Sequence, residues 1–204
     1  MASSRKSEKM MNGENLHVNA ESRVFNVPNV LSFLRIISAP AIIVMMTYPD
    51  KTMSFITAAF FALVCVTDLL DGYLARKNAT ITTLGKVLDP LADKILITGV
   101  FIMLIPLGRI PAWVVAVVII REIAVTGLRS IASSVGVVMS ASNSAKMKTI
   151  MQIICLVPLI AHYDFWFLNF HESGNILLIF AVALTVWTGV DYFVEFFRKC
   201  SLTE

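Results

Sequence analysis

Charged residues are scarce in this sequence: Asp, Glu, Lys and Arg make up 15% of its 204 residues, whereas 57% are hydrophobic. A soluble domain typically has about 25% charged residues, so the composition excludes one. The apolar residues are gathered into long runs separated by short polar stretches. We therefore expect an all-α integral membrane protein that crosses the bilayer several times.

Cysteine is also scarce. Cys65, Cys155 and Cys200 are odd in number and widely spaced, so we expect reduced packing residues and no disulfide framework. Residues 1–22 lack the apolar core of a signal peptide, and their mixed acids and bases disfavour a mitochondrial transit peptide. We expect a disordered cytosolic tail at 1–22, a membrane domain at 23–199 and a C-terminal tail at 200–204.

Six apolar segments come close to the roughly 20 residues that a membrane span requires. They are Val30–Tyr48, Met53–Ala75, Val87–Leu107, Pro111–Ser130, Thr149–Leu168 and Asn175–Phe197. Lysine and arginine mark the cytosolic side of a membrane protein. With a cytosolic amino terminus, only Lys51 and Arg109 fall on the opposite side. Both termini are therefore expected to face the cytosol.

Four aspartates stand beside apolar sequence between Val66 and Lys94. An ionisable residue within a membrane span is costly, so four acids in one window indicate a functional site. On a helix, Asp68 and Asp71 lie roughly 60° apart, and Asp89 and Asp93 roughly 40° apart, so each pair shares a face. Two such faces brought together would form a cage of carboxylate oxygens.

The cage suits a particular kind of metal. No His or Cys lies between residues 66 and 94, and hard oxygen ligands favour Mg²⁺ or Mn²⁺ over Zn²⁺. Four carboxylates are more than one ion normally needs. Two ions about 3.5–4 Å apart would neutralise them and clamp the attacking and leaving oxygens of a phosphoryl transfer. The sequence therefore predicts two divalent cations, Mg²⁺ or Mn²⁺.

Small residues and one arginine accompany the aspartates. Gly72, Ala75 and Gly85 lie on or near the same faces, where they would leave room for a ligand or let two helices approach closely. Plain helix packing is the alternative for these three residues. Arg76 could bind a phosphate in bidentate fashion.

The order of these residues resembles the signature of a known family. The pattern D-x2-D-G-x2-A-R-x8-G-x3-D-x3-D runs without a gap from Asp68 to Asp93, and it is similar to that of the CDP-alcohol phosphotransferases, integral membrane enzymes of phospholipid synthesis. The resemblance implies a binuclear metal site with Asp68, Asp71, Asp89 and Asp93 as ligands. It also implies that Asp93 is the general base and that Gly72 and Arg76 contact the nucleotide.

A second likeness lies before the first span. N-V-P-N-V-L-S-F-L-R, at 26–35, resembles the N-x-P-N-x-L-T-x-x-R opening of bacterial members, with Ser32 in place of threonine. In relatives this region lines the nucleotide pocket, which makes Asn29 and Ser32 candidate contacts. A helix start at Pro28 and Asn29 is the alternative. The expected contacts of CDP-diacylglycerol are therefore Asn29, Ser32, Asp68, Gly72, Ala75, Arg76 and Gly85.

Basic residues further along the chain bear on the second substrate. Arg121 and Glu122 interrupt the fourth span, Arg129 follows on nearly the same helix face, and Lys146 and Lys148 come in the next connection. Such a cluster is what a phosphate monoester would need. The alternative is that Arg121 pairs with Glu122 or an aspartate for structure alone, while the others are ordinary cytosolic loop charges.

The segments R-E-I-A-V-T-G-L-R at 121–129 and S-A-K-M-K-T at 144–149 resemble those of phosphatidylglycerophosphate synthases, one branch of the family. The likeness covers about 26–151, and beyond that only the hydropathy agrees. It implies glycerol 3-phosphate as the acceptor, with Arg121, Arg129 and Lys146 as phosphate ligands. It also suggests a homodimer.

Two other functions are weighed against this one. A cardiolipin synthase of the same family would use phosphatidylglycerol and would not need a phosphate-monoester pocket. A cation transporter would distribute its acids along a path across the membrane, whereas here they are concentrated at one edge. We expect a bacterial plasma membrane protein whose partners are CDP-diacylglycerol, glycerol 3-phosphate and the lipid bilayer, with no nucleic acid.

Overall fold

The structure is a computed structural model that describes residues 27–77, 83–135, 143–164 and 169–200. Side chains are described at 32–67, 90–135, 147–164 and 169–199. The tail expected at 1–22 lies outside the described residues, as do residues 201–204 of the tail expected at 200–204.

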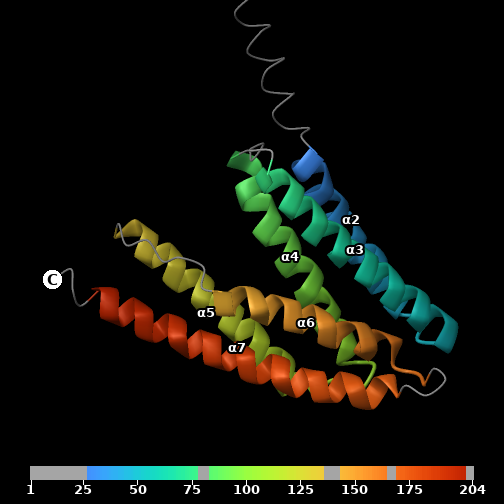
Figure 1. Cartoon of the computed structure of the whole chain (residues 1–204). Helices are drawn as coiled ribbons and strands as arrows, with labels where there is room; N and C mark the ends of the chain where they lie inside the picture. Colours follow the sequence, from blue (N-terminus) through green and yellow to red (C-terminus); the bar gives the residue numbers. More distant parts are fainter. Residues whose placement is uncertain (1–26, 78–82, 136–142, 165–168, 201–204) are drawn as a thin grey trace, which may run out of the picture. The chain divides into compact units, whose positions relative to one another are not determined.

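All regular structure among the described residues is helical, and it forms six helices (Figure 1). They are α2 (Val27–Met46), α3 (Lys51–Lys77), α4 (Thr83–Leu104), α5 (Ala112–Ser134), α6 (Asn143–Ala161) and α7 (Phe170–Cys200). Each overlaps one of the six predicted segments. The all-α prediction is therefore confirmed for the described part of the chain.

Helix ends follow local backbone chemistry. Pro111 immediately precedes α5 with extended backbone angles, and Gly108 in the preceding turn has a φ of 67°, which glycine adopts without strain. His162 ends α6 with a φ of 59°, and its N–H donates to the Pro158 carbonyl at 2.8 Å. The prediction that the fifth span continues to Leu168 is wrong at residues 162–164, which are not helical.

Helix α7 has the length that a membrane span requires. In the part of the chain that the structure describes, Phe170–Lys199 is the one helix long and apolar enough to cross a bilayer, by length and composition alone. Shorter apolar stretches occur at Ser32–Met46, Lys51–Thr67 and Met147–Ala161. That all six helices cross the membrane remains a prediction.

The chain divides into two compact units. Of the described residues, the first contains 27–39, 64–77 and 83–96, and therefore the start of α2, the end of α3 and the start of α4. The second contains residues 40–63 and 97–204. Within the second unit, α7 packs along both α6 and α5 (Figure 1).

A close contact fixes α6 against α7. A Cβ atom added at Gly174 of α7 would lie 2.9 Å from the Leu159 Cδ2 atom of α6. A side chain at this position would force Leu159 or the helix backbone to shift, so glycine permits the close approach that is common where membrane helices meet. Leu156, Leu159 and Ile160 of α6 are almost completely buried at this interface and its surroundings.

A buried arginine caps the carboxyl end of α6 in the second unit. Arg109 is 5% exposed, and its guanidinium donates to the Leu159 carbonyl at 3.2 Å and also to the Ile160 carbonyl. It donates to the Ser54 hydroxyl of α3 at 3.1 Å. The last carbonyls of a helix lack partners within it, so Arg109 satisfies two of them and ties α6 to α3.

His162 lies beside this arginine, between α6 and α7. Its ring centroid is 4.8 Å from that of His171 and 5.4 Å from that of Tyr163. Burial lowers the pKa of His162, and the neighbouring Arg109 and His171 lower it further, whereas Asp164 acts to raise it. His162 is therefore held neutral in the fold to a lower pH than in the unfolded chain.

This lowered pKa predicts a pH dependence of stability. As pH falls below about 6.5, the unfolded chain binds a proton at His162 that the folded chain resists, so the melting temperature should fall. His162→Asn removes the titrating group and suits the left-handed backbone. The measurement is the melting temperature in detergent between pH 5 and pH 8, in the wild type and the variant. Parallel curves for the two proteins would contradict the prediction.

Candidate functional site

The four aspartates are carried by two helices of the first unit. Asp68 and Asp71 belong to α3, and Asp89 and Asp93 belong to α4. The backbone is helical at all four positions, so each pair is spaced about one turn apart, as the sequence predicts. The side chains of Asp68, Asp71 and Asp89 lie outside the described residues, and so do those of Asn29, Ala75 and Arg76. Gly72 and Gly85 belong to the same stretches of α3 and α4.

Asp93 is described and has a buried partner. Arg35 of α2 donates from Nη1 to the Asp93 Oδ1 atom at 2.7 Å. The arginine side chain is 4% exposed, whereas that of the aspartate is 42% exposed. Such a contact offsets the charge of a buried arginine. It also fixes one carboxylate oxygen of the residue expected to be the general base.

Sequence reasoning counted Arg35 only as a cytosolic charge and as the last residue of the opening motif. The signal that could have singled it out was its position, because an ionisable residue within an apolar segment needs a partner. Ser32, one turn earlier on α2, is completely buried. Its role as a nucleotide contact remains a prediction.

The expected metal site depends on the chemistry of its ligand atoms. Among the described side chains, no group of three or more His, Cys, Asp or Glu residues could hold an ion. Three of the four expected ligands are not among them. Four carboxylates on two helices remain a donor set suited to Mg²⁺ or Mn²⁺, and the exposed fraction of Asp93 leaves it accessible to a ligand.

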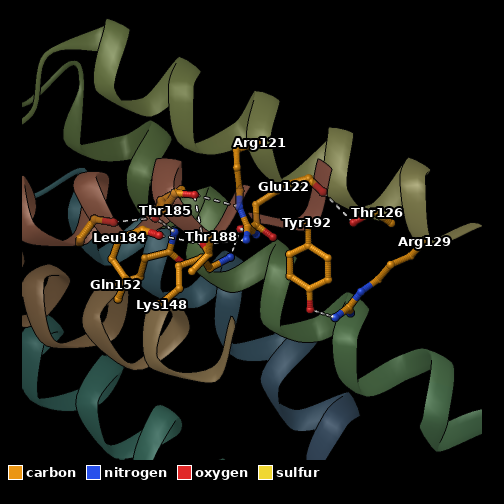
Figure 2. Close-up of polar contacts among 11 residues, drawn as sticks. Arg121, Glu122, Thr126, Arg129, Lys148, Gln152, Leu184, Thr185, Thr188 and Tyr192 are labelled. Atoms are coloured by element: carbon orange, nitrogen blue, oxygen red, sulfur yellow. Dashed lines mark hydrogen bonds and ion pairs between the residues drawn. The ribbon is translucent and has the colours of Figure 1, made fainter. Parts of the chain in front are cut away.

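A second group of polar residues lies in the second unit, and we call it the polar cluster. Figure 2 shows how α5, α6 and α7 contribute to it. Its members are Arg121, Glu122, Arg129, Lys148, Gln152, Thr185, Thr188 and Tyr192.

Arg121 is held mainly by α7. Its Nε donates to the Thr185 carbonyl at 3.1 Å and its Nη2 donates to the Thr188 hydroxyl at 2.8 Å. A Cβ atom added at Gly189 would lie 3.0 Å from the Arg121 Cγ atom. The absence of a side chain at Gly189 therefore leaves the space in which the arginine stem lies.

Glu122 is the carboxylate of the polar cluster. Its Oε1 atom lies 3.4 Å from Nη1 of Arg121 and also contacts Nζ of Lys148. The side chains of Arg121, Glu122 and Lys148 are 10%, 19% and 6% exposed. Two buried cations thus share one carboxylate, which joins α5 to α6. The alternative pairing of Arg121 with Glu122 is present in the structure.

Arg129 lies two turns beyond Arg121 on α5. Its Nη2 donates to the Tyr192 hydroxyl (Figure 2). The same ring lies 4.9 Å from the Arg129 Cζ atom and 5.9 Å from the Arg121 Cζ atom. The Nε atom of Arg129 is buried and has no hydrogen-bond partner among the described residues.

The structure therefore brings together two of the three residues expected to bind a phosphate. Arg121 and Arg129 flank one tyrosine, whereas the side chain of Lys146 lies outside the described residues. The α7 residues were missed because Thr185, Thr188 and Gly189 carry no charge. Their only signal was small and hydroxyl-bearing residues in an apolar span, which commonly mark a helix interface.

Comparisons with known proteins cover most of the chain. A family model described as CDP-alcohol phosphatidyltransferase matches residues 25–187. The CDP-diacylglycerol–glycerol-3-phosphate 3-phosphatidyltransferase of Bacillus subtilis (strain 168) is 37% identical over 182 residues, which is 83% of this chain and 94% of that protein. The protein of the same name from Rickettsia typhi is 34% identical over 169 residues, covering 82% and 95%.

A probable phosphatidylglycerophosphate synthase of Mycobacterium tuberculosis (strain ATCC 25618 / H37Rv) is 34% identical over 184 residues, covering 87% of this chain and 84% of that protein. The expectation that the likeness ends near residue 151 is wrong, because the family model continues to residue 187. The added part contains residues 170–187 of α7, among them Thr185, whose carbonyl accepts from Arg121.

The shared carboxylate predicts a test of stability. Glu122→Gln would leave Arg121 and Lys148 buried without the charge they share, and breaking a buried pair costs about 3–5 kcal/mol. Glu195→Gln is the matched control, because Glu195 bonds Lys199 at 2.6 Å in a partly exposed pair on α7. Its loss should cost less than about 1 kcal/mol. Unfolding in detergent would measure the loss of stability in each variant. Equal losses in Glu122→Gln and Glu195→Gln would contradict the role given to Glu122.

Proposed function

The chain belongs to the CDP-alcohol phosphatidyltransferase family, and we propose that it transfers the phosphatidyl group of CDP-diacylglycerol to glycerol 3-phosphate. The products are phosphatidylglycerol phosphate and CMP. The relatives in Bacillus, Rickettsia and Mycobacterium bear names for this enzyme or its activity. The protein is thus a transferase of phospholipid synthesis.

The observation that carries the choice of acceptor is the excess positive charge of the polar cluster. Among the side chains that the structure describes there, the three cations Arg121, Arg129 and Lys148 outnumber the one carboxylate, that of Glu122. Buried cations in apolar helices are unfavourable without a counter-charge. A phosphate monoester would supply that charge, and arginine binds phosphate with two parallel hydrogen bonds. Phosphatidylglycerol has only a diester, so the cluster disfavours a cardiolipin synthase.

The donor half of the reaction is assigned to the first unit. Two divalent cations, Mg²⁺ or Mn²⁺, would be held by Asp68, Asp71, Asp89 and Asp93 and would offset charge that develops on the diphosphate. Arg76 would bind a phosphate of the nucleotide. The remaining contacts are assigned to Asn29, Ser32, Asp68, Gly72, Ala75 and Gly85.

We assign Asp93 the role of general base. It accepts the proton of the primary hydroxyl of glycerol 3-phosphate as that oxygen attacks the phosphorus bearing the lipid. The new phosphorus–oxygen bond forms, the bond to the CMP oxygen breaks, and CMP leaves. Arg35 supports this step by fixing the Asp93 Oδ1 atom at 2.7 Å, which limits the orientations of the carboxylate.

The proposed setting is the plasma membrane of a bacterium. All six helices would cross the bilayer, with both termini and the aspartates on the cytosolic side, and the protein would form a homodimer. CDP-diacylglycerol would enter sideways from the inner leaflet with its acyl chains still among lipids. Glycerol 3-phosphate would arrive from the cytosol.

The acceptor is tested by CMP release from purified protein in detergent with CDP-diacylglycerol and Mg²⁺. Glycerol 3-phosphate, phosphatidylglycerol, serine and inositol phosphate are compared as acceptors. Release only with glycerol 3-phosphate is expected. Release with another acceptor would overturn the choice of acceptor, and no release with any of them from folded, metal-bound protein would favour cation transport.

The role of Asp93 predicts the effect of a conservative change. Asp93→Asn keeps an oxygen that accepts from Arg35, so the fold should survive, while loss of the base should lower kcat by about a hundredfold or more. The control is Asp50→Asn at the start of α3, where the Asp50 side chain accepts from the Met53 N–H at 3.2 Å. Asparagine caps a helix equally well. Activity close to that of the wild type in Asp93→Asn would remove Asp93 from the mechanism.

A further inference from the structure

Arg129 has one buried hydrogen-bond donor that no described residue satisfies. A guanidinium has five N–H donors arranged in a fixed plane. One of them, on Nη2, is donated to the Tyr192 hydroxyl. The Nε–H is buried, and no described residue accepts from it. A buried donor without a partner is unfavourable, and an oxygen supplied by a ligand would satisfy it.

Tyr192 is a rigid support for this arginine. The side chain comes from α7 and is 2% exposed, so its ring is fixed by the surrounding helices. Its hydroxyl accepts from Arg129, and its ring centroid lies 4.9 Å from the Arg129 Cζ atom. A cation within about 6 Å of an aromatic ring is attracted to its face. Two contacts from one residue therefore restrict the position of the guanidinium.

The chemistry of this support differs from that of the neighbouring cations. Arg121 and Lys148 both contact the carboxylate of Glu122, which cancels part of their charge. The contact of Arg129 within the polar cluster is a neutral hydroxyl. A tyrosine can orient an arginine without neutralising it, whereas an aspartate or glutamate in its place would compete with an incoming anion.

We infer that Tyr192 is a positioning residue for the acceptor, which holds Arg129 so that its Nε–H points to the phosphate of glycerol 3-phosphate. The inference rests on the proposed function, because it takes Arg129 to be a phosphate ligand. Tyr192 itself does not contact the reacting atoms. It acts through Arg129 and raises the affinity for the acceptor.

The first variant is Tyr192→Phe, which removes the hydroxyl and keeps the ring. Loss of one hydrogen bond to a charged group should raise the KM for glycerol 3-phosphate about tenfold or more. The kcat and the KM for CDP-diacylglycerol should stay unchanged, since neither depends on Arg129. A merely structural role would not separate these constants.

Tyr163→Phe is the matched control. It deletes a hydroxyl that donates to the Pro49 carbonyl at 2.5 Å, elsewhere in the second unit. The chemical change is the same, but Arg129 is not involved. All three kinetic constants of this variant should equal those of the wild type. An equal rise in the acceptor KM of both variants would overturn the inference.

A double variant tests whether Tyr192 acts through Arg129. Arg129→Ala should raise the acceptor KM more than Tyr192→Phe does, and adding Tyr192→Phe to it should cause no further rise. If the two substitutions raise the KM for glycerol 3-phosphate independently, so that their effects multiply in the double variant, the inference is overturned. An unchanged KM in Tyr192→Phe would also overturn it. If the KM rises in Arg129→Ala alone, only the positioning role fails. If the wild type does not use glycerol 3-phosphate, the proposed function fails, and this inference with it.

Discussion

Arginines buried among apolar helices must each find a partner, and this requirement fixes much of the fold. Arg35 is paired with a carboxylate, Arg109 donates to the last carbonyls of α6, and Arg121 donates to a carbonyl and a hydroxyl of α7. Each contact joins segments that are distant in sequence. Because an unpaired charge in such surroundings is strongly unfavourable, the partners determine which helix faces can meet.

The kind of partner distinguishes a structural arginine from one that we propose to serve the substrate. Arg109 is held by backbone carbonyls and the Ser54 hydroxyl, so its donors are used in closing a helix end. Arg35 holds an aspartate that retains 42% exposure, so its charge supports a group that can still act on a ligand. In the polar cluster the cations outnumber the carboxylate, and the remaining charge is what an anionic substrate would neutralise.

Sequence reasoning identified the helices because their signal is local. Six apolar runs with turn residues between them correspond to α2 to α7. Two aspartates one turn apart can be recognised from their spacing alone, without knowing where their helix lies in the fold. Arg121 and Arg129 were also found, because charges within an apolar span are conspicuous. The end of α6 was placed too late, since the left-handed turn at His162 lacks the glycine that usually marks such a turn.

What the sequence could not supply were partners that come from another helix. The pairing of Arg35 with Asp93 joins residues that are 58 positions apart, and no local spacing predicts it. The contribution of α7 was harder still, because it consists of a carbonyl, a hydroxyl and the space above Gly189. None of these features is charged, so none gives a signal in the sequence. A helix whose contacting residues carry no charge can therefore determine how the charged side chains of its neighbours are arranged, and the family likeness continues into α7 as far as residue 187.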